Sequence, residues 1–336
     1  MSRNLEATAP TRVDLAGGTL DIWPLYLMLD GPVTVNLGLA LPTRVRLSRA
    51  PGRSIRIRSL DHGTEERFPG PKAAIARARH RLAAEALRAL PAGGLSVETS
   101  SGVPPGSGLG GSSSLSVALL AALSRWTGTR LGDRTALALF ASNVEGRVIQ
   151  VPPGSQDHLA AARGGLAAWE YGPAGVARRG LGADPAWLAR RLVLAYTGVS
   201  HSSAVNNWRV TRAFLDGDRG VRRGFAEVAA AAREVRDALD ARDLAAVAAG
   251  MDRDSRARRR LFPGFHTPRT LALARAARRA GALGGRPCGA GGGGSMAFVV
   301  GDAARRAAVE RALARLGATL LPVVPDLRGV RVRWLP

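Results

Sequence analysis

Cysteine is nearly absent from this chain. Its 336 residues include one cysteine, Cys288, which excludes an internal disulfide and a metal cluster built on several cysteines. No run of eighteen apolar residues occurs, so the sequence predicts no membrane-spanning helix and no membrane partner. The first residues, MSRNLEATAP, lack the basic and then apolar pattern of a secretory signal. We therefore expect a cytoplasmic protein.

Lysine is equally scarce. Lys72 is the only lysine among 48 lysines and arginines, so the formal charge of +22 comes from arginine. The arginines are spread along the chain, with one tighter run at residues 256–260. A clustered basic patch is typical of nucleic-acid binding. Dispersed arginines instead favour a general attraction for phosphorylated substrates, and we expect no specific nucleic-acid partner. A basic nucleic-acid module is the alternative interpretation.

Two common nucleotide-binding motifs are missing as well. The chain contains no Gly-x-x-x-x-Gly-Lys-Ser/Thr sequence and no strand-linked Gly-x-Gly-x-x-Gly followed by a ribose-binding acid. It does contain a glycine- and serine-rich stretch, PPGSGLGGSSS, at residues 104–114. Apolar residues at helical spacing follow this stretch, so a helix is predicted to begin near residues 112–114.

Such a helix start is a favourable place for an anion. The first amides of a helix lack partners, the helix dipole adds positive charge, and glycine lets the backbone approach a phosphate closely. We expect the phosphates of a nucleotide there, with a flexible linker as the alternative interpretation. The predicted nucleotide-binding residues are Pro104, Gly106, Ser107, Gly108, Leu109, Gly110, Gly111, Ser112 and Ser113.

The remaining pattern predicts an α+β protein. Residues 5–60 are expected to form mainly strands with a hairpin corner at 50–52, and residues 72–90 a single amphipathic helix. Residues 151–165 are rich in proline and glycine and predict a loop, and helices are expected over much of 203–281. Further elements are expected as follows: strands at 95–97, 166–171, 192–196, 296–300, 318–324 and 329–335, and helices beginning at 133 and spanning 303–317. We place two domains at residues 1–185 and 186–336.

Three separated motifs resemble those of the GHMP kinase superfamily, in the same order along the chain. They are residues 9–21 (APTRVDLAGGTLD), the glycine stretch at 104–114, and residues 288–294. The resemblance covers nearly the whole sequence. It implies a fold with an N-terminal domain like ribosomal protein S5 domain 2 and a ferredoxin-like C-terminal domain. It also implies an ATP-dependent enzyme that uses Mg²⁺.

A fourth segment narrows the resemblance to sugar kinases. The loop GSQDH at residues 154–158, followed by Gly164 and Gly165, resembles that of kinases acting at an anomeric hydroxyl. These include D-glycero-D-manno-heptose 7-phosphate kinases, fucokinases and galactokinases. The resemblance implies a sugar or sugar-phosphate substrate, with a heptose 7-phosphate as first choice. The alternatives are a mevalonate- or homoserine-type kinase and a non-catalytic sugar sensor. Both a monomer and a homodimer are compatible with the sequence.

The resemblance assigns roles to individual residues. Asp157 is the candidate base for the acceptor hydroxyl, and Arg12 is the arginine near the transferring phosphate or the base. Ser112 and Glu145 are the candidate Mg²⁺ ligands, since Mg²⁺ prefers a few protein oxygens alongside phosphates and water. Asp157 could instead cap the following segment, and Glu145 could be a surface acid paired with an arginine. The expected substrate-binding residues are Asp21, Gly17, Gly18, Gly291 and Gly292.

The chain also departs from the family pattern. Residues 17–21 read GGTLD where galactokinases have GEHTD, which disfavours plain galactose. Gly111 stands where the second motif has the first serine of a pair, and Arg286 stands at the lysine position of the third motif. The sequence gives no role for His201.

Overall fold

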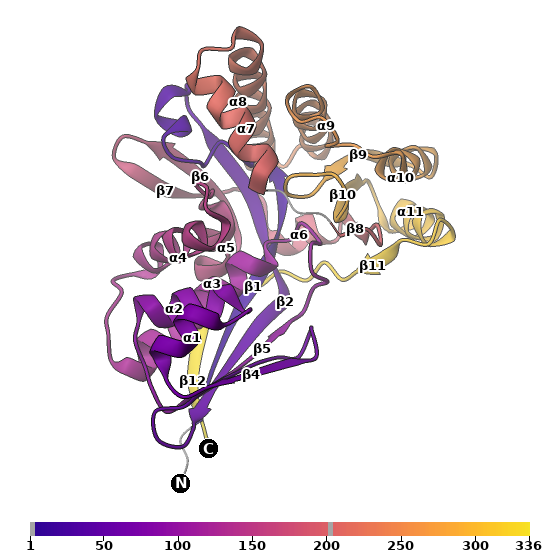
Figure 1. Cartoon of the computed structure of the whole chain (residues 1–336). Coiled ribbons are helices and arrows are strands. Elements are labelled where there is room, and N and C mark those ends of the chain that lie inside the picture. Colours follow the sequence, from indigo (N-terminus) through magenta and orange to yellow (C-terminus); the bar gives the residue numbers. More distant parts are fainter. Residues whose placement is uncertain (1–3, 201–203) are drawn as a thin grey trace.

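The computed structural model describes residues 4–200 and 204–336, which form two sheets flanked by helices (Figure 1). The larger, eight-stranded sheet has the order β12-β1-β2-β5-β3-β4, and β6 pairs with both β2 and β7. Its strands are β1 (Asn4–Ala16), β2 (Val33–Arg49), β3 (Ile55–Ser59), β4 (Thr64–Phe68), β5 (Leu95–Ser101), β6 (Leu166–Gly172), β7 (Gly175–Gly180) and β12 (Arg331–Leu335). The smaller sheet has the order β11 (Thr319–Leu321), β8 (Leu192–Tyr196), β10 (Ser295–Val300) and β9 (Ala282–Pro287).

The helices divide between the two sheets. In the first half of the chain they are η1 (Leu25–Met28), α1 (Pro71–Arg77), α2 (Arg81–Ala89), α3 (Gly111–Thr127), α4 (Arg134–Ile149), α5 (Gln156–Arg163) and α6 (Pro185–Ala189). In the second half they are α7 (Ala204–Leu215), α8 (Arg219–Asp240), α9 (Leu244–Leu261), α10 (Pro268–Arg279) and α11 (Ala303–Arg315). Within the described part of the chain, no helix is long and apolar enough to cross a bilayer.

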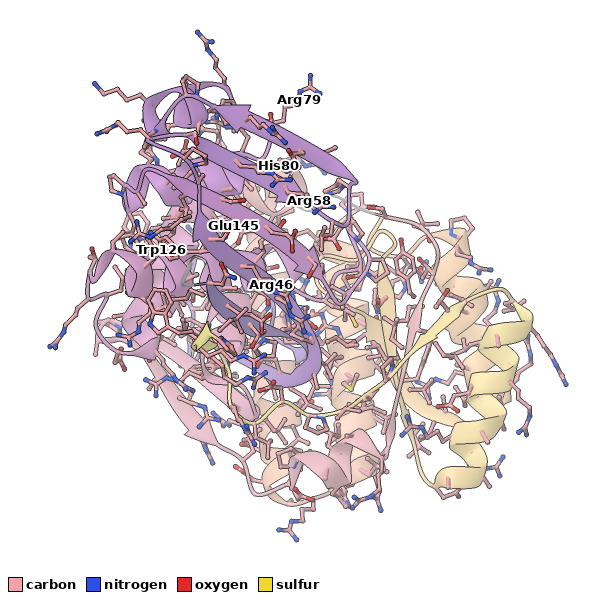
Figure 2. All side chains as sticks on the ribbon, turned by 90° about the horizontal axis from the view of Figure 1, so that it is seen from below. Arg46, Arg58, Arg79, His80, Trp126 and Glu145 are labelled. Atoms are coloured by element: carbon pink, nitrogen blue, oxygen red, sulfur yellow. The ribbon has the colours of Figure 1, made fainter. Side chains whose placement is uncertain are left out.

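Where β1, β2, β3 and β5 lie side by side, the larger sheet has one apolar face and one charged face. Leu5 and Leu47 lie opposite each other on β1 and β2 and belong to the core that α3 covers. On the other face, Arg46 bonds to Glu6 at 2.9 Å and Arg58 to Glu98 at 3.3 Å (Figure 2). The period-2 alternation of the strands produces this division. These surface arginines are therefore paired with carboxylates along the sheet.

The predicted hairpin at residues 50–52 is wrong. Strand β5 lies between β2 and β3, antiparallel to β2 and parallel to β3. The turn at 50–52 does reverse the chain, but the apolar side chains of β5 fill the place beside β2. A local turn signal specifies a reversal and not a pairing partner.

Two further expectations about local structure are corrected. The predicted helix over 72–90 is broken into α1 and α2, because the Arg79 and His80 amides donate to the Glu66 carboxylate on β4 at 3.0 and 3.2 Å. The predicted loop at 151–165 contains helix α5. Its prolines end at Pro153 and its last two glycines follow the helix, so the leucine and alanines between them form a helix that is buried in the core.

Other expectations are confirmed. Helix α3 begins at Gly111, and Asp133 caps α4 by accepting a hydrogen bond from the Ala136 amide at 2.8 Å. Helices α7 to α10 fill most of the region 203–281, as expected. The final strand, β12, returns to the first sheet and pairs with β1. The division of the chain at residue 185 stays a prediction.

Candidate functional site

Two glycine-rich turns, far apart in the sequence, lie against each other beside a cleft of about 720 Å³. The Ser295 amide donates to the Ser107 carbonyl at 2.7 Å, which ties the turn before β10 to the turn before α3. A Cβ atom at Gly294 would lie 2.8 Å from the Ser107 carbonyl oxygen, and Gly294 has a φ of +65°. The close approach therefore requires a residue without a side chain.

The cleft follows the start of α3. Gly110 is the N-cap, in the left-handed conformation with a φ of 73°, and Gly111, Ser112 and Ser113 form the first turn. The free amides and the dipole of this 17-residue helix favour a bound anion. Of the predicted nucleotide-binding residues, these line the cleft: Pro104, Gly106, Ser107, Gly108, Gly110, Gly111, Ser112 and Ser113. Leu109 is instead buried in the core, and its carbonyl accepts a hydrogen bond from the Arg12 amide.

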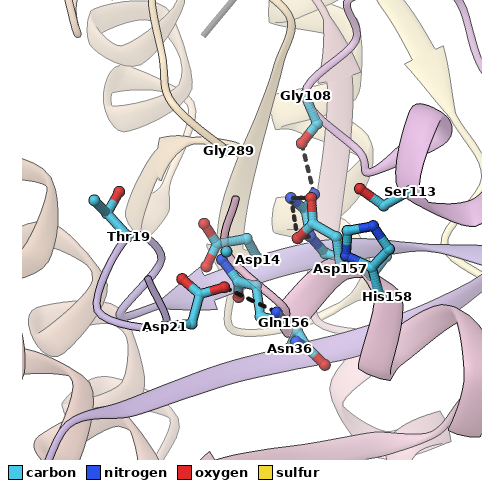
Figure 3. A network of polar contacts seen from close by, with 12 residues as sticks. Asp14, Thr19, Asp21, Asn36, Gly108, Ser113, Gln156, Asp157, His158 and Gly289 are labelled. Carbon is cyan, nitrogen blue, oxygen red and sulfur yellow. Dashed lines mark hydrogen bonds and ion pairs between the residues drawn. The ribbon is translucent and has the colours of Figure 1, made fainter. Parts of the chain in front are cut away.

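Asp157 and Arg12 line the cleft and form a two-pronged ion pair. Arg12 Nε donates to Asp157 Oδ1 and Arg12 Nη2 to Asp157 Oδ2, both at 2.7 Å. Arg12 Nη1 donates to the Gly108 carbonyl at 2.6 Å, and dashed lines in Figure 3 mark these contacts. Burial opposes the charge of Arg12, but Asp157 and Asp14 outweigh it and raise the pKa of the guanidinium. The Asp157 carboxylate thus binds Arg12 and does not cap α5.

Glu145 also lines the cleft, close to the start of α3. The Ser112 hydroxyl donates to Glu145 Oε1, and the Ser113 hydroxyl donates to Oε2 at 2.8 Å. His158 Nε2 lies 2.7 Å from Oε2. Burial alone would raise the pKa of Glu145, but His158 and then the two serines outweigh it and lower that pKa. Glu145 is therefore a buried, ionised side chain and not the surface acid of the alternative interpretation.

These two oxygen-bearing residues fit a hard cation. A hydroxyl from Ser112 and a carboxylate from Glu145 are the donor types that Mg²⁺ takes when phosphates and water complete its shell. Both residues line the cleft beside the helix start that favours an anion. The predicted pair of ligands is thus brought together.

Asp21 lies in the same cleft and accepts a hydrogen bond from the Gln156 amide at 2.8 Å (Figure 3). Its burial raises its pKa to about 6, because an ionised carboxylate is costly away from water. Gly18 also lines the cleft, and a Cβ there would lie within 2.9 Å of both Arg258 and Asp14. A side chain at this position would therefore displace the charged groups packed against the turn.

The other predicted substrate glycines lie behind the cleft surface. Gly17 donates its amide to Asp254 at 3.0 Å, and Gly292 donates its amide to the Phe265 carbonyl at 2.9 Å. A Cβ at Gly291 would meet the Phe265 ring at 2.3 Å. Of the third glycine run, Gly289 lines the cleft. Binding roles for Gly17, Gly291 and Gly292 stay predictions, and His201 lies outside the described residues.

Sequence reasoning missed a buried set of charges under the Gly17–Thr19 turn. Arg286 bonds to Asp14 at 3.1 Å and lies 3.0 Å from Asp254, and all three side chains are fully buried. Arg258 lies 3.4 Å from Asp254 and donates to the Thr19 hydroxyl at 3.1 Å. Burial lowers the pKa of Arg258, and Asp254 opposes this effect. Arg258 also lines the cleft, so its charge faces the region of Asp21.

A weak signal for part of this set was present in the sequence. Arg258 lies within the tight run at 256–260, and Asp254 is four residues earlier, on the same face of α9. Asp14 stands inside the first motif. In a chain so rich in arginine, composition gives no reason to prefer one of them over another.

Comparison with protein families gives two matches. Residues 74–165 match the model of the GHMP kinase N-terminal domain, and residues 235–319 match the model of the GHMP kinase C-terminal domain. Together these segments cover more than half of the chain. No curated protein sequence matches significantly.

Solved structures share the fold at low identity. A D-glycero-D-manno-heptose 1-phosphate kinase from Bacteriodes thetaiotaomicron is 21% identical, with a TM-score of 0.75 and 98% of each chain covered. Lactococcus lactis galactokinase complexed with galactose is 17% identical, with a TM-score of 0.77 and 98% of this chain and 95% of that chain covered. L. major mevalonate kinase, in complex with R-mevalonate, is 21% identical, with a TM-score of 0.70 and 95% of each chain covered.

These results confirm the resemblance and the two-domain fold inferred from the three motifs. Ser112, Glu145 and Asp157 all lie inside the first matched segment, and Arg258 and Arg286 inside the second. The chain belongs to the GHMP kinase family and is an ATP-dependent phosphotransferase.

Proposed function

We propose that this enzyme transfers the γ-phosphoryl group of ATP to a hydroxyl of a sugar or sugar phosphate. The position we favour is the anomeric hydroxyl, and the first candidate is a D-glycero-D-manno-heptose 7-phosphate. The observation that carries the proposal is the position of Asp157. Its carboxylate is fixed by Arg12 and lies 3.3 Å from the position of a Cβ on Gly110, at the anion-favouring start of α3. A base and a phosphate site are thus in contact.

Asp157 is suited to receive the proton of the acceptor hydroxyl. As the acceptor oxygen bonds to the γ-phosphorus, the bond from that phosphorus to the β-phosphate oxygen breaks, and the hydroxyl proton passes to Asp157. The two oxygens of a carboxylate offer about four lone-pair positions. Arg12 uses one on each oxygen, so others stay available for the hydroxyl. Arg12 also fixes the direction in which the carboxylate points.

Charge compensation comes from both sides of the cleft. Phosphoryl transfer spreads negative charge over the oxygens of the moving group, and guanidinium groups and helix amides stabilise it. Arg12 and the first turn of α3 are placed for this role. Ser112 and Glu145 would hold Mg²⁺, which supplies further positive charge next to the phosphates when it is bound.

The acceptor end of the cleft supports a polyhydroxylated substrate. Asp21 can accept hydrogen bonds from sugar hydroxyls, while Thr19 offers a hydroxyl next to it. Arg258, whose guanidinium is buried and donates to Thr19, adds a positive charge at this end. That charge is our reason for favouring an acceptor that already carries a phosphate. All these residues belong to one chain, so both a monomer and a homodimer are compatible with the proposed reaction. We expect the enzyme to work in the cytoplasm, where ATP is present.

Asp21 gives the reaction an expected pH dependence. With a pKa of about 6, Asp21 is ionised at pH 8 and protonated at pH 5, where it accepts fewer hydrogen bonds from hydroxyls. We expect the KM for the acceptor to rise as the pH falls through 6. Asp21→Asn should abolish this rise and give a high KM at all pH values. Steady-state kinetics from pH 5 to 8.5 measure the effect, and an unchanged pH profile in Asp21→Asn would contradict the assignment.

The same carboxyl should limit stability at neutral pH. Its pKa in the folded protein lies above the ordinary value of 3.8, so the favourable contribution of its protonated form is lost as the pH rises through 6. The loss corresponds to at most about 3 kcal/mol, at 1.36 kcal/mol for each pKa unit. Asp21→Asn should therefore raise the free energy of unfolding at pH 8 but not at pH 4. Urea unfolding at both pH values checks this sign.

An acceptor screen tests the proposal. Purified enzyme with Mg²⁺ and ATP should release ADP with a heptose or hexose, or one of its phosphates, and ³¹P NMR of the product should give a sugar 1-phosphate signal. Mevalonate and homoserine are tested as alternative acceptors, and buffer without acceptor is the control. Turnover with mevalonate or homoserine and none with any sugar would overturn the sugar assignment. Binding of sugars without turnover would instead favour a non-catalytic sensor.

A further inference from the structure

A buried histidine lies between the two functional groups of the proposed reaction. His158 follows Asp157 in the first turns of α5, and its side chain is 1% exposed. Its Nε2 atom lies 2.7 Å from Glu145 Oε2, a direct polar contact between two buried side chains. The sequence motifs assign no role to His158. It joins the helix of the candidate base to the candidate metal ligand.

The two oxygens of Glu145 have different surroundings. Oε2 accepts a hydrogen bond from the Ser113 hydroxyl at 2.8 Å and lies 2.7 Å from His158 Nε2, and Ser113 and His158 are both buried. Oε1 contacts the Ser112 hydroxyl, which lies in the first turn of α3. Oε2 thus contacts two buried side chains, and Oε1 contacts Ser112, the other residue expected to bind the cation.

We propose that His158 is a positioning residue which, together with Ser113, holds Glu145 Oε2 so that Oε1 and the Ser112 hydroxyl face the cation of a Mg²⁺–nucleotide complex. The inference rests on the proposed function. Partners behind a metal ligand fix its orientation, and their loss commonly weakens metal binding by about 10- to 100-fold. An Nε2–H group on His158 is sufficient for this role. The same contact fixes α5, and therefore Asp157, relative to α4, which carries Glu145.

Two amide variants separate the position of the donor from the presence of a polar side chain. In His158→Gln the amide nitrogen can occupy the place of Nε2, whereas in His158→Asn it occupies the place of Nδ1 and cannot reach Glu145. The probe is Mn²⁺, measured by its EPR signal, with a non-hydrolysable ATP analogue and no acceptor. We expect His158→Gln to bind Mn²⁺ within about threefold of the native protein, and His158→Asn to bind it about 10- to 100-fold more weakly. Affinity for the analogue without metal should stay equal in both.

The controls keep the outcomes distinct. His266→Asn changes another partly buried histidine, which bonds to Ser255, and should leave Mn²⁺ affinity unchanged. Ser113→Ala removes the second donor to the same oxygen without touching the ring, and should weaken Mn²⁺ binding even if His158→Asn does not fold. The inference would be overturned if folded His158→Asn and Ser113→Ala both bound Mn²⁺ with native affinity. It would also be overturned if His158→Asn and His158→Gln lost Mn²⁺ affinity equally. Neither result would affect the proposed function. Absence of Mn²⁺–analogue binding by the native protein would overturn the proposed function as well.

Discussion

Replacing Asp157 with asparagine is expected to lower kcat by about 10²- to 10⁴-fold, the usual contribution of a general base. Asparagine has nearly the same shape as aspartate but lacks the charge and accepts no proton. Arg12 would lose its charged partner, and breaking a buried ion pair costs about 3–5 kcal/mol. We therefore expect a lower melting temperature together with the loss of turnover. Single-turnover measurements with saturating ATP and acceptor give the rate of the chemical step.

A matched variant separates chemistry from stability. Asp302→Asn changes the N-cap of α11, remote from the cleft, and asparagine is an equally good cap, so turnover should be native. For Asp157→Asn, the affinity for a non-hydrolysable ATP analogue should stay within about threefold, because the start of α3 is unchanged. Near-native kcat in folded Asp157→Asn would mean that another group receives the proton.

Replacing Gly294 with alanine is expected to weaken ATP binding by about 5- to 30-fold. An alanine at a φ of +65° costs about 1–2 kcal/mol, and its Cβ would lie 2.8 Å from the Ser107 carbonyl oxygen. The turn of residues 104–110 must then move away from the turn of 288–294, which disturbs the amides at the start of α3. Isothermal titration with an ATP analogue measures the loss.

The matched control lies at the other end of β10. Gly301 has open space around the position of a Cβ and has no left-handed φ, so Gly301→Ala should bind the analogue with native affinity. Equal affinity in Gly294→Ala and Gly301→Ala would show that contact between the two turns does not support nucleotide binding.

Local sequence signals predicted where helices α3 and α4 begin. Helix starts depend on nearby residues, so the serines after Gly111 and the cap at Asp133 were readable without tertiary information. Ser112 and Glu145 were instead assigned by resemblance to the family; the structure brings them together, and their role as metal ligands stays a prediction.

Long-range contacts explain what the sequence could not give. The break between α1 and α2 depends on Glu66, a residue of a strand that precedes them. The placement of β5 between β2 and β3 depends on which apolar strand fills the sheet. Asp254 and Arg258 reach the cleft only because α9 packs beneath the Gly17–Thr19 turn, where they contact Gly17 and Thr19. Each of these contacts joins segments that are distant in the sequence, and no pattern within either segment identifies the other.

A crystal structure with Mg²⁺ and a non-hydrolysable ATP analogue would locate the triphosphate directly. We expect it between the turns of residues 106–111 and 288–294, with its γ-phosphate toward Asp157 and the cation between Ser112 and Glu145. A triphosphate bound elsewhere, or one whose γ-phosphate points away from Asp157, would contradict this expectation.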